Sequence, residues 1–194
     1  MGSMNELMAQ ARHRITVADY YRMAEAGILA APDRVELIDG GIVDMAPIGS
    51  KNAFVVSRLA QFFTLAARDR YLVGTQNPVR LNELSEPQPD ISLLKPGNYM
   101  DHLPGPADVL LIVEVAHSSI DFDRGVKLNL YAHHNIPEVW LLDLAGGELF
   151  VYREPADGQY RMLRKPLANE SVAPLLMPDV ELRLESGKTW STPY

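Results

Sequence analysis

The stretch VLLIVEVAHSSIDFDRGVKLNLY, residues 109–131, decides how this chain folds. It opens with an apolar run, Val109 to Val115, which predicts a strand covered on both faces of a sheet. Residues 122–134 then place apolar side chains at helical spacing, which predicts a helix. One carboxylate, Glu114, interrupts the apolar strand. Because a buried carboxylate without a partner is destabilised by several kcal/mol, Glu114 requires a compensating group.

Shorter elements surround this strand and helix. We expect helices over residues 16–27 and 50–70 (with Ser50 as a cap), a hairpin over 34–47, and strands over 71–81, 91–94, 138–144, 149–153, 159–165 and 180–184. This order predicts an α/β (mixed α+β) fold, in which helices flank a central mixed β-sheet. We expect one domain over residues 16–185, after an expression scar and flexible N-terminus (1–15) and before a C-terminal tail (186–194).

The amino-acid composition limits the classes of protein and of site that the chain can form. The chain has 194 residues, 47% of them hydrophobic, which is enough for one globular core. It has no cysteine, which excludes disulfides and thiolate metal sites and fits a reducing cytoplasm. We find no apolar run of the roughly 20 residues that span a membrane and no export leader, so we expect a cytoplasmic protein. The formal charge of −7 argues mildly against a large nucleic-acid surface, although a bound cation would reverse the sign locally.

Three acidic residues fall on predicted strands. Glu36 lies in the first hairpin, Asp90 opens a strand after Pro89, and Glu114 lies in the central strand. Because the helix can fold back over the strand before it, Asp90, Glu114 and Lys127 can converge. Two carboxylates can hold a divalent cation such as Mg²⁺, while a lysine orients water and stabilises charge on a phosphate. The pattern is typical of metal-assisted phosphodiester hydrolysis.

Each residue also has a structural interpretation. Glu114 could end its strand and reach solvent, or pair with Lys127. Asp123 and Lys127 could form an i,i+4 surface pair, worth roughly 0.3–0.5 kcal/mol. Asp90 after a proline could serve a turn. Taken alone, the residues leave both interpretations open.

Three blocks of the chain resemble a known family: VELIDGGIVDMAPIGS, QNPVRLNELSEPQPDIS and VLLIVEVAHSSIDFDRGVKLNLYAHHNIPEVWLLDL. Their order and spacing resemble the Uma2 family, formerly the domain of unknown function DUF820, within the PD-(D/E)xK nuclease-like superfamily. The resemblance covers residues 16–184. It implies a restriction-endonuclease-like core and an endonuclease that uses Mg²⁺ (or Mn²⁺) to cleave nucleic acid, with DNA as the favoured substrate. It also makes a homodimer plausible.

Carried over residue by residue, the resemblance implies roles for single side chains. Asp90 would be the aspartate of the PD motif and Glu114 the acid of the (D/E)xK motif, both as metal ligands. Lys127 would replace the motif lysine, and Glu36 would be a helper acid that binds the metal directly or through water. Gln88, in the SEPQPD block, is an accessory candidate.

The chain departs from the family pattern at three positions. Ala116 occupies the standard place of the motif lysine, His117 replaces an acid, and Asn52 replaces a histidine. His117, Asn52 and Asp123 are further accessory candidates. These departures support a rival interpretation, a catalytically inactive nuclease fold that acts as a homo-oligomeric binding or interaction module. A nuclease needs Lys and Arg side chains around its carboxylates to neutralise phosphates. Such side chains around the carboxylates would favour the enzyme, and their lying elsewhere would favour the rival. The candidates for this phosphate-binding role are Lys51, Arg58, Arg80, Lys95 and Arg124.

Overall fold

The computed structural model describes residues 13–30, 33–116 and 123–183. Backbone contacts divide the chain into two compact units. Unit 1 comprises residues 1–46 and 80–87, and unit 2 comprises residues 47–79 and 88–194. Within the described ranges, no helix is both long and apolar enough to cross a bilayer.

Unit 1 contains a helix and a hairpin, as the sequence predicts. They are α2 (Val17–Glu25), β1 (Val35–Ile38) and β2 (Gly41–Asp44). The helix begins at a capping box, in which the Thr16 hydroxyl accepts from the Asp19 N–H and the Asp19 carboxylate accepts from the Thr16 N–H. The hairpin turns at Asp39 and Gly40, which both take the positive φ that a tight two-residue turn between antiparallel strands requires.

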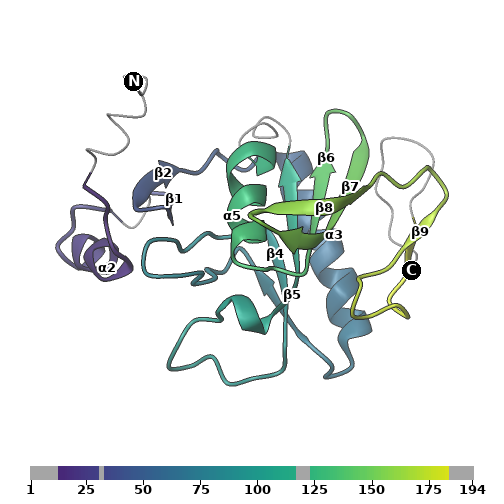
Figure 1. Ribbon diagram of the computed structural model, residues 1–194, viewed down its shortest axis with the longest axis horizontal. Helices are drawn as coiled ribbons and strands as arrows, with labels where there is room; N and C mark the ends of the chain where they lie inside the picture. Colours follow the sequence, from purple (N-terminus) through teal and green to yellow (C-terminus); the bar gives the residue numbers. More distant parts are fainter. Residues whose placement is uncertain (1–12, 31–32, 117–122, 184–194) are drawn as a thin grey trace. The chain divides into compact units, whose positions relative to one another are not determined.

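The main sheet of unit 2 has the strand order β3-β4-β5-β6-β7-β8 (Figure 1). Its strands are β3 (Leu72–Thr75), β4 (Ile91–Leu94), β5 (Val109–Ala116), β6 (Glu138–Asp143), β7 (Glu148–Ala156) and β8 (Gln159–Arg164). β5 and β6 are parallel, whereas every other neighbouring pair is antiparallel. The sheet is therefore mixed, as predicted, and the apolar strand β5 lies inside it with a neighbour on each side.

Helices cover both faces of this sheet (Figure 1). The remaining elements of unit 2 are α3 (Ser50–Ala67), a 3-10 turn (Pro106–Asp108), a π-helical segment (Asp123–Lys127), α5 (Leu128–His133), β9 (Ser171–Val172) and β10 (Leu182–Arg183). Leu111, Val113 and Val115 of β5 pack in the core that α3 covers. Since side chains alternate along a strand, Glu114 points to the opposite face, toward α5.

Two strand predictions need correction. The strand expected over residues 71–81 ends at Thr75, because Gln76 takes a left-handed φ of 52° that a strand cannot continue. Gln76 is held there by hydrogen bonds to Asp90, a partner distant in sequence that no local pattern indicates. The strand expected over 180–184 is reduced to β10, which pairs with β9.

The helices also differ from their predicted ends. Ser50 is the first helical residue of α3 and not its cap, since Gly49 holds the cap position without a side-chain hydrogen bond. α3 ends at Ala67, earlier than expected, because Arg68 takes a positive φ. The helix expected over 122–134 begins as a π-helix before it becomes α5.

A buried acid ties the C-terminal segment to the sheet. Glu138 is fully buried, and its Oε1 accepts hydrogen bonds from Trp140 Nε1 and Arg153 Nε, each at 2.8 Å. Its Oε2 accepts from the Leu175 N–H, and Arg153 also donates to the Ala173 carbonyl at 2.8 Å. Loss of the arginine would therefore leave a buried carboxylate without its cation.

We expect Arg153→Ala to lower the free energy of unfolding by about 3–5 kcal/mol, because Glu138 stays buried and loses its charge partner. Urea denaturation measures this loss. The matched control is Arg161→Ala, which removes a surface ion pair with Asp157 and should cost less than about 1 kcal/mol. Equal losses in the two variants would contradict the role given to the Glu138–Arg153 pair.

Candidate functional site

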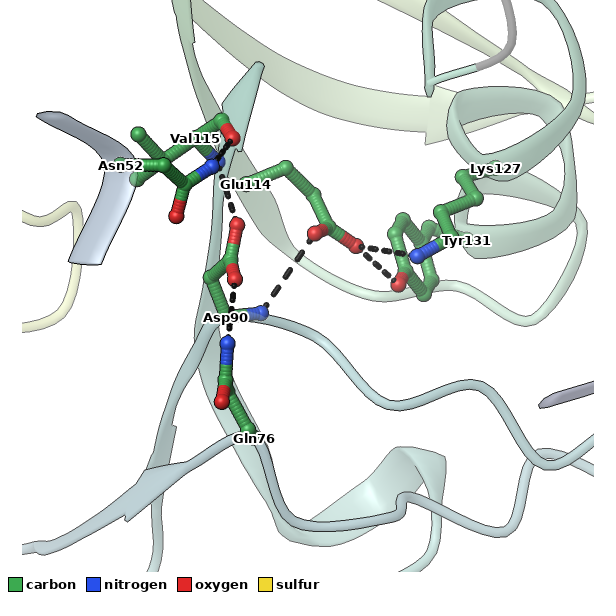
Figure 2. A network of polar contacts seen from close by, with 7 residues as sticks. All are labelled: Asn52, Gln76, Asp90, Glu114, Val115, Lys127 and Tyr131. Carbon is green, nitrogen blue, oxygen red and sulfur yellow. Dashed lines mark hydrogen bonds and ion pairs between the residues drawn. The ribbon is translucent and has the colours of Figure 1, made fainter. Parts of the chain in front are cut away.

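Glu114 has only 5% of its surface exposed, and two side chains of the facing helix hold it (Figure 2). Its Oε1 accepts a hydrogen bond from Tyr131 Oη at 2.6 Å and lies 3.4 Å from Lys127 Nζ. Lys127 ends the π-helical segment, and Tyr131 follows at i+4 in α5, so both donors share one helix face. The pairing of Glu114 with Lys127 is confirmed, and the idea that Glu114 reaches solvent is wrong.

Asp90 reaches Glu114 through the register of the sheet. Ile91 of β4 lies opposite Val113 of β5, so the antiparallel register brings the preceding residue, Asp90, next to Glu114. The Asp90 N–H points to Glu114 Oε2 at 3.4 Å, a long hydrogen bond. Figure 2 shows the two carboxylates next to each other, one from the residue before β4 and one from β5.

The Asp90 carboxylate is fixed from two sides. Its Oδ2 accepts from the Val115 N–H at 2.8 Å, and its Oδ1 accepts from Gln76 Nε2 at 3.2 Å. Gln76 also donates its own N–H to the Asp90 carbonyl at 3.1 Å. Because regular pairing with β4 stops at Val113, the backbone of Val115 is open to side chains on that edge. The Asp90 carboxylate accepts a hydrogen bond from the Val115 N–H, and the Asn52 side chain donates one to the Val115 carbonyl.

Asn52, near the start of α3, leaves one polar atom unmatched. Its Nδ2 donates to the Val115 carbonyl, which settles the orientation of the amide because a carbonyl can only accept. Its Oδ1 is then a buried acceptor without a donor in the described part of the chain. Such atoms are rare in native proteins and often mark a place where an ion or water is held.

Two residues of this network were not predicted from sequence. The i,i+4 spacing of Lys127 and Tyr131 is visible in the chain, but an apolar environment explains a helical tyrosine equally well. No sequence pattern marks Gln76 as part of the site, because the sequence predicts that it lies within a strand over residues 71–81. Its link to Asp90 depends on a left-handed turn after β3.

Glu36 lies in β1 of unit 1 and is 2% exposed, whereas the other predicted catalytic residues lie in unit 2. Within unit 1, burial and the charges of Glu86 and Glu36 raise the pKa of Tyr20. Glu86 accepts from Tyr21 Oη at 2.7 Å and from Arg80 Nε at 2.9 Å, and burial together with Glu86 raises the pKa of Tyr21 to about 12. The role of Glu36 as a helper acid stays a prediction.

The accessory candidates have varied positions. Gln88 is half-buried and lies two residues before Asp90. Ala116 is fully buried at the end of β5 and occupies the standard place of the motif lysine. The lysine that contacts Glu114 is Lys127, from the helical segment. His117 and the side chain of Asp123 lie outside the described residues.

Asp90 and Glu114 together could hold a divalent cation. Within the described ranges, no three His, Cys, Asp or Glu side chains gather into a larger metal site. A pair of carboxylates nevertheless fits Mg²⁺ or Mn²⁺, which are bound by oxygen and often take further ligands from water and substrate phosphates. Asn52 donates through Nδ2 to the carbonyl of Val115, and its amide oxygen has no donor in the described part of the chain. An amide oxygen, like a carboxylate oxygen, is a ligand that such cations accept. The donor set is therefore compatible with a hard cation.

Comparison with known proteins agrees with this architecture. A model of the Uma2 family, described as "Putative restriction endonuclease", matches residues 17–185. The chain is also similar to a crystal structure described as a "putative nuclease belonging to DUF820" from Anabaena variabilis, with a TM-score of 0.67 and 16% sequence identity over 87% of this chain and 94% of that chain. No curated protein sequence matches the chain.

The structural likeness, at this low identity, confirms the fold class predicted from sequence. The family model covers most of the chain, including Glu36, Asp90, Glu114 and Lys127. The chain therefore belongs to the Uma2 family.

Proposed function

We propose that this protein is a metal-dependent endonuclease that hydrolyses phosphodiester bonds of nucleic acid, with DNA as its substrate. The observation that carries the proposal is the placement of two acidic residues side by side, Asp90 just before β4 and Glu114 in β5, with the buried Lys127 against Glu114. The descriptions of the family and of its solved relative as nucleases support the same reaction class. We further propose that it acts in the cytoplasm as a homodimer, with Mg²⁺ or Mn²⁺.

The burial of these charges supports a chemical role. The side chains of Lys127 and Glu114 are 7% and 6% exposed. For such a pair the desolvation penalty often cancels the attraction, and apolar side chains of equal size would be about as stable. Charged groups held in this way are typical of sites where a protonation state or a bound ion is needed.

The residues would divide the work as follows. Asp90 and Glu114 would hold the cation, and the bonds from Val115 and Gln76 keep the Asp90 carboxylate from rotating away. The cation, when bound, would neutralise the phosphate and make a coordinated water more acidic. Lys127 would orient the attacking water and stabilise negative charge on the phosphate.

One observation favours a second candidate, the inactive nuclease fold that serves as an interaction module. In the described part of unit 2, two of the predicted phosphate-binding cations lie away from the carboxylates. Lys95 follows β4 at the end opposite to Asp90, and Arg58 lies near the middle of α3. Arg80 belongs to unit 1. Lys51 is exposed beside Asn52 at the start of α3, and the side chain of Arg124 lies outside the described residues.

Calorimetric titration of Mg²⁺ and Mn²⁺ into the wild type and the Asp90→Ala/Glu114→Ala double variant tests the metal site. We expect saturable binding by the wild type and none by the double variant, which lacks both ligands. A second series includes a short DNA duplex, because Mg²⁺ sites are often completed by phosphate oxygens. If the wild type binds no cation in either series, the interaction module becomes the better conclusion.

Lys127→Met is expected to retain Mg²⁺ binding and to lower the rate of DNA cleavage by about 10²–10⁴-fold, the usual effect of losing one positioned catalytic group. Nicking of supercoiled plasmid measures the rate. The control is Lys165→Met, which removes a lysine paired with Glu148 beyond β8 and should cleave as the wild type does. Cleavage at the wild-type rate by Lys127→Met would remove Lys127 from the mechanism.

Asp90→Asn is expected to keep the metal-free protein as stable as the wild type, within about 1 kcal/mol. The amide oxygen can still accept from Val115, the amide nitrogen can donate to Gln76 once the Gln76 amide turns over, and one of two neighbouring negative charges is removed. Mg²⁺ should raise the melting temperature of the wild type but not that of Asp90→Asn, since only folded protein with an intact site binds the ion. The control is Asp179→Asn, at the surface pair with Arg70, which should keep the Mg²⁺ effect. An unchanged Mg²⁺ effect in Asp90→Asn would contradict its role as a ligand.

A further inference from the structure

We propose that Tyr131 sets which cation the site accepts. Together with Lys127, it holds Glu114 so that only one carboxylate oxygen is offered to a metal, which favours Mg²⁺ over Ca²⁺. This inference rests on the proposed function, because it concerns the same pair of carboxylates. Tyr131 is a positioning residue in this scheme and acts through Glu114.

Both donors act on the same oxygen of Glu114. Tyr131 Oη lies 2.6 Å from Oε1, and Lys127 Nζ lies 3.4 Å from that atom. A carboxylate oxygen offers about two lone-pair positions. The short bond from Tyr131 fills one of them, and the positive charge of Lys127 faces the same oxygen and repels a second cation there. A cation that bound Oε1 as well would have to displace the Tyr131 hydroxyl or lie against the Lys127 charge.

The second oxygen of Glu114 faces a different group. Figure 2 shows Oε1 directed to the helix and Oε2 directed to Asp90. The contact of Oε2 with the Asp90 N–H is 3.4 Å long, beyond the usual range for an N–H···O bond, and therefore weak. A cation shared by Asp90 and Glu114 would meet Glu114 through Oε2.

The number of oxygens that a carboxylate offers discriminates between cations. Ca²⁺ accepts many oxygen ligands in flexible geometry and often binds both oxygens of one carboxylate. Mg²⁺ is smaller, requires near-octahedral geometry and keeps several waters, so it is served by single oxygens of one or two carboxylates. Occupation of Oε1 therefore disfavours Ca²⁺ more than Mg²⁺.

Tyr131 is placed to enforce this restriction. It is fully buried, so its ring has no room to turn the hydroxyl away from Glu114. Its short bond to an acidic oxygen is of the strong, charge-assisted kind. Lys127 lies on the same helix, so the two donors keep a fixed spacing with respect to Glu114.

The test is separate titration of Mg²⁺ and Ca²⁺ into the wild type and Tyr131→Phe by calorimetry. We expect the affinity for Ca²⁺ relative to Mg²⁺ to rise about fivefold in the variant, the size of effect that one hydrogen bond carries. The matched control is Tyr71→Phe. Tyr71 is also buried in unit 2, and its hydroxyl donates one bond, to the Phe63 carbonyl at 2.8 Å. This control should leave the ratio unchanged.

Lys127→Met provides a second route to the same oxygen. Loss of the positive charge should tighten the binding of both cations, but the ratio should again move toward Ca²⁺ because Oε1 no longer faces a positive charge that repels a cation. This variant carries the test alone if Tyr131→Phe does not fold.

The outcomes separate this inference from the proposed function. Metal binding with an unchanged Ca²⁺ to Mg²⁺ ratio in Tyr131→Phe, or in Lys127→Met where Tyr131→Phe does not fold, would overturn the selectivity role and leave the metal site intact. Equal weakening of both cations in Tyr131→Phe would also overturn it. Failure of the wild type to bind either cation, with or without a DNA duplex, would overturn the metal site and the selectivity role together.

Discussion

The candidate site depends on one constraint, the need to balance a carboxylate inside a buried strand. Glu114 lies in β5 with neighbouring strands on both sides, where water cannot solvate it. Its charge is met by Lys127 and its hydrogen bonding by Tyr131, both from the helical connection between β5 and β6. The same connection that makes β5 and β6 parallel therefore also supplies the groups that make Glu114 tolerable.

A second constraint shapes the other half of the site. Where β4 stops pairing with β5, the backbone of Val115 needs partners, because buried backbone groups are rarely left without hydrogen bonds. Asp90 and Asn52 supply them. Asp90 thus serves the sheet and the site at once, and its carboxylate is oriented by the same bond that completes the strand edge. This dual use gives the proposed metal-binding carboxylate a fixed position without a further element to support it.

Sequence reasoning succeeded where a single local pattern dominated. The apolar run of β5, the spacing of Lys127 on the following helix and the hairpin at Asp39 and Gly40 were all readable because each depends on neighbours in the chain. Sequence reasoning failed at Gln76, where the residue pattern predicts a continuing strand but the backbone turns and the side chain bonds to Asp90. A residue whose conformation is decided by a distant partner leaves no local pattern to read.

The sequence by itself determined the mixed α/β class, the buried strand that contains Glu114, and the need for a positively charged group near that carboxylate. Only the tertiary structure decided that Lys127 in fact contacts the acid and that Tyr131 completes its hydrogen bonding. The convergence of Asp90, Glu114 and Tyr131 requires the β4–β5 register and the return of α5 over the sheet, and both are long-range contacts. Periodicity specifies which face a side chain lies on, but the partner on the facing element is chosen by packing and hydrogen bonding between segments far apart in the chain.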